Sequence, residues 1–503
     1  MRIAIGLAVA WLAWGQLPRP VAGTVVNGLT GEPLRRVSVQ VMSAARPVEP
    51  VVTDALGRFR LPELPPGRYL LRATRAGFFP SEKGDAAVEV TPGDGPAAVT
   101  IQLNPGAAVS GTVTDEAGEA LPGAQITLLR RAYVGGRKQL VLAGTGVTDD
   151  RGQYRLHGLA PHSYIVRAAV QRLAGDPQLY PPTYYPAAVE PEKALAVALG
   201  PGQEQRGVNI SLRPGPSHRV SGRLVNGLTN TPLTNTALTL MARGVGVAVL
   251  ETGPQVLVRD PGGRFTVQGV MPGQYDLTGS YLEAGQTLQV RMRLEVSRDL
   301  DDVVVTMRPG VTVRGRVVLE GEGKLEMGAL GVAVESDEDL VGGGGAARPG
   351  ADGTFLIGPL LPGSYGANVH RLPAGAYLRA VRVGGREAAL DLSGAAGQTV
   401  ETEWVISLRG GRVEGGTTAG AVVALVPATA AANRRSRYRA VEADGAGRFV
   451  LPGVAPGSYL LYAFRNAEAG AWMDDEFLRG LPEAGVAVTV GERETKVADV
   501  KAQ

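Results

Sequence analysis

The side chains that could carry out catalysis or bind a metal are sparse and poorly placed for either role. The chain has no cysteine, so it can form no thiolate nucleophile, cysteine metal site or disulfide. A zinc peptidase site built on His-x-x-Glu is ruled out as well, because none of the four histidines has a glutamate three positions later: His157, His162, His218 and His370. We therefore predict neither a metal nor a cofactor.

The acidic clusters also lack the spacing of a known site. They lie at 299–302, 335–339 and 474–476. Paired carboxylates can serve glycoside hydrolysis or bind calcium, but no calcium-loop spacing accompanies these groups, and we interpret them as solvated loop charge. We predict no catalytic residue and a protein that is not an enzyme. An enzyme of unrecognised type is the least favoured alternative.

A tyrosine-rich insertion is the first candidate for ligand binding. It spans 172–193 and holds Tyr180, Tyr184 and Tyr185 among prolines. Aromatic faces on extended proline-rich backbone can stack on sugar rings. In the alternative interpretation, the tyrosines pack back on their own domain and cover an edge strand.

A basic cluster is the second candidate. Arg434, Arg435, Arg437 and Arg439 surround Tyr438. Such a cluster could meet an anionic polysaccharide or a membrane surface. The alternative is a solvated hairpin with no ligand.

The elements that must position these groups are marked by a pattern that recurs five times, at intervals of about 90 to 110 residues. In full it reads D-x-x-G-x-aromatic-x-aliphatic-x-x-aliphatic-x-P-G-x-Y, and single copies depart from it at the Asp or the second Gly. Its first Gly, aromatic and Tyr positions are Gly57, Phe59 and Tyr69; Gly152, Tyr154 and Tyr164; Gly263, Phe265 and Tyr275; Gly353, Phe355 and Tyr365; and Gly447, Phe449 and Tyr459. The pattern indicates five copies of one structural unit.

Each position of the pattern predicts a local structure. The D-x-x-G segment favours a turn, and the aromatic and the following aliphatic residue share one face of a strand, because side chains alternate along strands. Pro-Gly predicts a second turn, since proline fixes φ and glycine allows positive φ. The tyrosine is expected to bury its ring and bond its hydroxyl to the backbone, as at the corner of a β-sandwich.

Length and composition agree with this architecture. The 503 residues include 70 Gly and 35 Pro, as many turns require, and a hydrophobic share of 44% is enough to build cores. We predict an all-β chain, a tandem array of five antiparallel Ig-like or prealbumin-like β-sandwiches after a signal peptide. The predicted ranges are 1–15 for the signal peptide and then 16–105, 106–214, 215–309, 310–410 and 411–503 for the sandwiches.

The same residues resemble the carboxypeptidase regulatory-like family, whose domain is transthyretin-like. The resemblance is carried by G-T-V-x-D at 111–115, by L-P-G-A at 121–124 and by the repeated pattern. It implies a seven-stranded prealbumin-like sandwich within a wider carbohydrate-binding-like fold group, often in tandem on exported bacterial proteins. It implies no particular activity, because one fold serves many functions.

The start of the chain predicts export. Arg2 precedes an apolar run at 3–14 and a small-residue cleavage site before Gln16, so we expect a signal peptide and no transmembrane segment in the mature chain. The expected location is the periplasm, the outer cell surface or the extracellular space. A formal net charge of +3 gives no strong field toward nucleic acid.

The predicted function is non-catalytic binding at the cell envelope, with polysaccharide as the ligand and a stiff scaffold presenting the binding loops. The alternative is a purely structural spacer, or a module that docks an envelope protein by strand addition.

Overall fold

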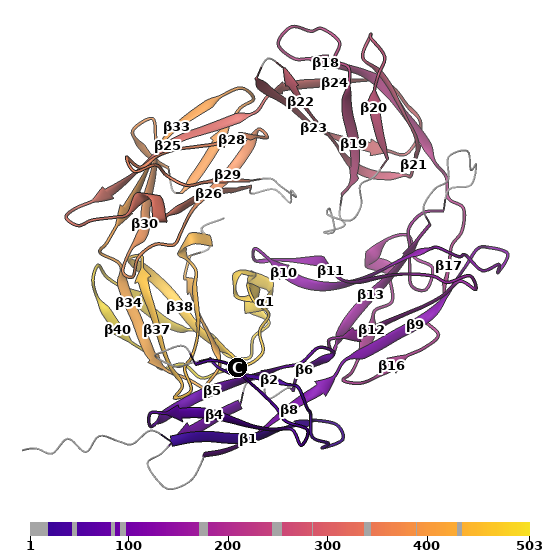
Figure 1. The fold of residues 1–503 in the computed structure, drawn as a ribbon. Helices are drawn as coiled ribbons and strands as arrows, with labels where there is room; N and C mark the ends of the chain where they lie inside the picture. The colour runs from indigo at the N-terminus through magenta and orange to yellow at the C-terminus, as the bar shows by residue number, and fades with distance from the viewer. Residues whose placement is uncertain are drawn as a thin grey trace, which may run out of the picture. The chain divides into compact units, whose positions relative to one another are not determined.

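The structure is a computed structural model that describes residues 19–42, 48–81, 86–90, 97–170, 180–243, 254–283, 285–336, 344–388, 390–429 and 435–503. Nearly all regular structure in these residues is β, as predicted (Figure 1). The only α-helix among them is α1 (Asp475–Arg479), and the 3-10 turns are η1 (Pro191–Lys193), η2 (Met327–Ala329), η3 (Arg435–Arg437) and η4 (Ala471–Met473). The predicted signal peptide at 1–15 lies outside the described residues.

We call the predicted ranges 16–105, 106–214, 215–309, 310–410 and 411–503 regions 1 to 5. By its internal contacts the chain divides into two compact units, of which the first covers Met1–Pro105 with Thr418–Gly420 and Ala443–Arg448, and the second the rest. The division into five domains therefore stays a prediction. The sheets themselves group by region, and each is described below.

Region 1 contains two four-stranded sheets. The strands are β1 (Arg19–Asn27), β2 (Ser38–Val41), β3 (Val51–Val52), β4 (Arg58–Leu64), β5 (Gly67–Thr74), β6 (Phe78–Pro80), β7 (Ala86–Val90) and β8 (Ala97–Pro105). They are ordered β4-β1-β8-β6 in one sheet and β3-β2-β5-β7 in the other. Leu61 from one sheet and Leu71 from the other belong to one buried apolar cluster, so the sheets pack face to face.

Region 2 has the same plan with an added edge. Its strands are β9 (Ala107–Thr114), β10 (Gln125–Val134), β11 (Arg137–Val147), β12 (Gln153–Leu159), β13 (His162–Ala169), β14 (Thr183–Tyr184), β15 (Val197–Leu199), β16 (Glu204–Gln205) and β17 (Ile210–Ser211). One sheet is ordered β11-β10-β13-β14 with β15 also on β13, and the other β12-β9-β16 with β17 also on β9. Leu128 and Val166 from the first sheet share a core with Val109 and Leu156 from the second.

Region 3 differs, because its strands form one sheet. They are β18 (His218–Asn226), β19 (Thr236–Ala242), β20 (Gln255–Val258), β21 (Arg264–Val270), β22 (Gly273–Glu283), β23 (Gln286–Val296) and β24 (Leu300–Pro309), in the order β20-β19-β22-β23-β24-β18-β21. The link between the halves is a short contact of β23 with β24, where Leu288 pairs with Pro309 and Gln289 with Arg308. The long β22–β23 hairpin thus joins two sheets that stay separate in the other regions.

Region 4 returns to two sheets. The strands are β25 (Val311–Glu320), β26 (Gly331–Ser336), β27 (Gly345–Ala347), β28 (Thr354–Leu360), β29 (Gly363–His370), β30 (Tyr377–Val383), β31 (Arg386–Ala388), β32 (Asp391–Gly394) and β33 (Thr399–Ser407). Their orders are β28-β25-β33-β30-β31 and β27-β26-β29-β32. Trp404 is fully buried in the core, and its ring packs edge-on against Phe355 with the centroids 5.1 Å apart.

Region 5 contains a three-stranded and a four-stranded sheet. The strands are β34 (Gly411–Gly416), β35 (Val422–Pro427), β36 (Arg439–Glu442), β37 (Arg448–Val454), β38 (Gly457–Phe464), β39 (Val486–Val490) and β40 (Thr495–Val497). The orders are β37-β34-β40 and β36-β35-β38-β39. An apolar cluster that includes Phe464 and Trp472 packs against Phe477 and Leu478 of α1.

One parallel strand pair recurs in every region, although the sequence predicted antiparallel sandwiches. The opening and closing strands run side by side in the same direction: β1 with β8, β9 with β16 and β17, β18 with β24, β25 with β33, and β34 with β40. The last strand returns to the first strand after the chain has passed through the other strands, which a parallel pair requires. Pairs such as β1 with β4, β10 with β13, β2 with β5, β26 with β29 and β35 with β38 are antiparallel.

The repeated pattern forms the corner of each region. In region 1, β4 carries Phe59 in one sheet, and the Pro-Gly turn passes the chain to β5 in the other. The Tyr69 hydroxyl then donates to the Pro65 carbonyl at 2.8 Å. The same bond, to the carbonyl four residues earlier, is made by Tyr164 (2.7 Å), Tyr275 (2.9 Å), Tyr459 (2.8 Å) and, to Leu361, by Tyr365. This is the corner expected from the sequence.

Candidate functional site

The tyrosine-rich insertion of region 2 packs on its own domain. Its described part begins at Tyr180, and Thr183 and Tyr184 form β14, which pairs antiparallel with β13. Tyr184 is 2% exposed and lies in an apolar cluster with Leu129 and Ile165. Tyr184 is therefore a core side chain, and its ring is not open to a sugar.

The two neighbouring tyrosines are half-buried. Both pack against the main core of region 2. The Tyr180 hydroxyl donates to the Glu116 carboxylate at 3.0 Å, and the Tyr185 amide donates to the Val166 carbonyl at 2.8 Å. Of the three predicted tyrosines, only Tyr180 and Tyr185 keep surface that a ligand could contact.

The basic cluster is partly turned into the protein. Arg434 and the side chain of Arg435 lie outside the described residues. The Arg437 guanidinium donates to the Arg379 carbonyl at 3.2 Å and lies 5.9 Å from the centre of the Tyr377 ring. Arg437 thus connects β36 and its preceding turn in region 5 with β30 in region 4.

Arg439 is half-buried and bonds to the backbone around it. Its guanidinium donates to the carbonyls of Ser436 at 2.6 Å, Tyr438 at 3.0 Å and Gly453 at 3.3 Å. Burial lowers the pKa of Arg439, and the charge of Arg437 acts in the same direction. The group stays cationic, because arginine does not lose its proton in proteins. No carboxylate in the described part of the chain forms an ion pair with it.

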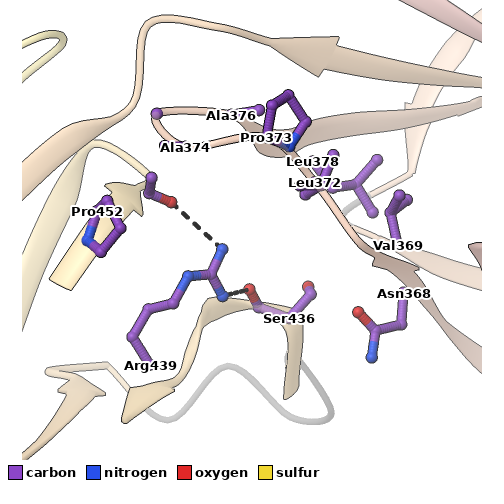
Figure 2. Close-up of a pocket in the computed structure, with 12 residues that line it drawn as sticks. Asn368, Val369, Leu372, Pro373, Ala374, Ala376, Leu378, Ser436, Arg439 and Pro452 are labelled. Atoms are coloured by element: carbon purple, nitrogen blue, oxygen red, sulfur yellow. Dashed lines mark hydrogen bonds between the residues drawn. The ribbon is translucent and has the colours of Figure 1, made fainter. Parts of the chain in front are cut away.

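Arg439 lines a cavity of about 200 Å³ between β36 and the segment that follows β29. Figure 2 shows Pro373, Leu372 and Leu378 of region 4 on the side opposite Arg439, whose guanidinium lies between Pro452 and Ser436. The Ser436 hydroxyl oxygen is buried and has no hydrogen-bond partner among the described residues. The cavity therefore has a polar end in region 5 and, in region 4, a wall of aliphatic side chains beside the amide of Asn368.

The acidic clusters are engaged in local contacts. Asp301 accepts from the Ser221 hydroxyl at 2.7 Å and pairs with Arg219 at 3.1 Å, and these contacts lower the pKa of Asp301. Asp474 accepts from the first amides of α1 and so acts as its N-cap. The cluster at 335–339 lies partly outside the described residues.

Within the described ranges, no group of three or more His, Asp and Glu side chains could hold a metal ion. The search for membrane spans, over those same ranges, finds no helix long and apolar enough to cross a bilayer.

The cavity beside Arg439 was not predicted from the sequence. Its apolar wall at 372–378 carries no chemical motif and lies far from Arg439 along the chain. The basic cluster was the only sequence feature that marked this place, and it suggested an exposed surface. Residues that are distant in the sequence and meet only in the folded protein form no recognisable sequence motif.

The corners, cores and sheet orders define a tandem β-sandwich protein. The family model for the carboxypeptidase regulatory-like domain matches residues 20–104 and 108–213, which contain the first two copies of the pattern. The resemblance predicted from the sequence is confirmed over these ranges. Comparison with curated proteins gives no match.

Among solved structures, the chain is similar to a streptococcal ancillary pilin, with 14% identity, coverage of 58% of this chain and 100% of that chain, and a TM-score of 0.22. It is similar to the shaft pilin SpaA from Lactobacillus rhamnosus GG, with 15% identity and a TM-score of 0.24. The match covers 40% of this chain and 98% of the pilin. It is also similar to the Bacillus anthracis TIE protein, with 12% identity and a TM-score of 0.16. That match covers 73% of this chain and 67% of the TIE protein. We draw no functional conclusion from these values.

Proposed function

We propose that this protein is a non-catalytic, exported scaffold whose β-sandwich regions hold docking surfaces for an envelope partner at fixed spacing. The observation that supports this proposal best is the joint between regions 4 and 5. Strand β33 ends at Ser407 and β34 begins at Gly411, so only a few residues separate the two sheets. The Gly410 amide donates to the Gly375 carbonyl at 2.8 Å, which leaves no free linker.

Side-chain contacts strengthen the same joint. The bond from Arg437 to the Arg379 carbonyl and the contact of Arg437 with Tyr377 cross from one region to the other. A joint held by backbone and side-chain bonds resists bending more than a flexible linker does. Stiffness of this kind suits a spacer or docking module.

Polysaccharide recognition, the finer function predicted from the sequence, stays a prediction. Tyr180 and Tyr185 are the side chains that would carry it, because Tyr184 is buried. Retention of a glycan that is lost in a Tyr180→Ala, Tyr185→Ala double variant would support it. Tyr281→Ala, which removes a half-buried tyrosine of region 3, is the matched control.

The scaffold proposal is tested by the distance distribution across the joint. The chain has no cysteine, so spin labels can be placed at Ala395→Cys and Ala487→Cys, both of which are exposed positions. We expect a narrow distribution that broadens in Arg437→Ala. The control is Arg314→Ala, which removes an arginine from an exposed ion pair with Glu401. A broad distribution in the unmodified protein would contradict a stiff scaffold.

The docking part of the proposal needs a partner. We expect the purified chain to retain a defined envelope protein from native membranes and to be recovered from the cell with its N-terminus at Gln16. Recovery of the chain in the cytoplasm with residues 1–15 intact would contradict export.

A further inference from the structure

We infer that the cavity beside Arg439 is a binding site for a small monocarboxylate with a short apolar body. The inference goes beyond the scaffold function, because a scaffold needs no small ligand. It rests on three properties of the cavity: the charge of Arg439 without a counter-charge, the buried Ser436 hydroxyl without a partner, and a small patch of aliphatic side chains in the lining (Figure 2).

The positive charge of Arg439 favours an anionic ligand. Arg439 donates to three backbone carbonyls, but these are neutral acceptors and leave its positive charge without a counter-charge. Enclosing a charge is costly unless an opposite charge accompanies it. A carboxylate placed against the guanidinium would supply that charge and form charge-assisted hydrogen bonds.

The hydroxyl supplies a second donor. The Ser436 oxygen is buried and has no partner among the described residues, whereas buried polar groups are normally hydrogen-bonded. Ser436 and Arg439 line the same end of the cavity. The hydroxyl oxygen is covered in this rotamer, so the Ser436 side chain must rotate about χ1 to reach the cavity. A carboxylate can then accept from the guanidinium with one oxygen and from the hydroxyl with the other.

The rest of the cavity selects the body of the ligand. Val369, Leu372 and Leu378 present aliphatic surface from region 4, and Pro452 adds to it from region 5. Asn368 adds one amide to the region 4 side. Drug-sized ligands occupy pockets of about 300 to 1,000 Å³, and this cavity of about 200 Å³ is smaller. A chain of a few carbons attached to the carboxylate matches the size of the cavity and the aliphatic part of its lining.

Binding is tested with sodium butyrate by titration calorimetry on the full chain without its predicted signal peptide. Butyramide, the neutral analogue of nearly the same shape, is the control ligand. We expect saturable butyrate binding, and butyramide weaker by at least about tenfold, because it lacks the charge that pairs with Arg439. Absence of saturable butyrate binding, or equal binding of butyramide, would overturn the inference.

Two variants locate the site. Ser436→Ala removes the unused hydroxyl and is expected to weaken butyrate binding by about tenfold, the effect of losing a hydrogen bond to a charged group. Ala374→Trp introduces a large ring at an exposed lining position and is expected to abolish binding. Ala395→Trp, at an exposed turn away from the cavity, should bind as the unmodified chain does.

Unchanged affinity in both Ser436→Ala and Ala374→Trp would place the butyrate elsewhere and refute the assignment. The outcome is independent of the scaffold function, because the spin-label distances are measured without butyrate. A stiff joint with no butyrate binding would support the scaffold proposal and refute the binding site. A flexible joint with butyrate binding would refute the scaffold proposal and support the binding site.

Discussion

At the scale of single residues, one carboxylate organises each D-x-x-G turn. Asp54 accepts from the amides of Leu56 at 2.9 Å and Arg58 at 2.8 Å, and from the Arg58 guanidinium at 3.0 Å. Asp149, Asp260 and Asp444 repeat the two amide bonds. The fourth copy places Gly350 at this position, and the Asp352 carboxylate accepts from the Thr354 amide at 3.1 Å instead. A carboxylate therefore bonds to the amide that follows the glycine in every copy, although in the fourth copy it comes from a different position.

The turn at Asp54 is expected to open in acid. The hydrogen bond from the Arg58 amide is the largest cause that lowers the pKa of Asp54 below its ordinary value of 3.8. A lowered folded pKa means that the stabilisation is fully present above the ordinary value and is lost as the pH falls through the folded one. The Leu56 and Arg58 amide resonances should therefore shift with a midpoint below 3.8, measured by NMR on the full chain.

Asp54→Asn is the control for this titration. Its side chain keeps an acceptor oxygen but has no acidic proton, so the shift of the two amides should disappear. A midpoint at or above 3.8 in the unmodified chain would contradict the lowered pKa.

At the scale of strands, the aromatic residue of each corner packs over a glycine of the opening strand. Gly23 pairs with Phe59, Gly111 with Tyr154, Gly222 with Phe265 and Gly315 with Phe355. A Cβ atom on Gly315 would lie 2.0 Å from the Phe355 ring, closer than any real contact. Glycine is needed here because the ring occupies the place of a side chain.

Gly315→Ala is expected to destabilise region 4 by about 1 to 3 kcal/mol, because the added methyl forces the buried Phe355 ring to move. Trp404 contacts Phe355 and reports on this core. Urea unfolding can be followed by its fluorescence in a Trp472→Phe variant that lacks residues 1–15 and with them Trp11 and Trp14. Gly328→Ala, where nothing lies within 4 Å of the new atom, should change stability by less than about 0.5 kcal/mol. Equal effects of the two variants would refute this role for Gly315.

At the scale of the whole molecule, each region carries its own buried core. All buried residues in the core of region 4 lie between Val311 and Ile406, so none of them comes from another region. A range that completes its own core can fold alone. The boundaries at 310 and 410 stay a prediction, which a fragment with these ends can test.

The fragment 310–410 is therefore expected to unfold cooperatively in urea and to give a circular dichroism spectrum of β-strands. The fragment 355–455 has the same length but lacks β25, β26 and β27, so it should stay unfolded. Non-cooperative unfolding of 310–410 would contradict the boundaries.

Much of the fold could be predicted because its signals are local. The spacing from Gly57 to Tyr69 contains the turn, the strand and the corner within one short stretch, and hydrogen bonds between near neighbours form it. The parallel pairing of β1 with β8 could not be predicted in this way, because Val21 and Ala97 meet only when the chain has passed through the other strands. The single sheet of region 3 depends likewise on a contact between β23 and β24.

The candidate sites show the same division. The sequence alone identified the tyrosines of the insertion and the arginines around Tyr438 as clusters. It also predicted that the five corners are strand-turn-strand units. Only the tertiary structure decided that Tyr184 is buried beside Ile165 and that Arg439 faces an apolar wall from region 4. Periodicity and turn chemistry act between neighbours in the chain, whereas burial and the shape of a cavity are set by residues that folding brings together from distant positions.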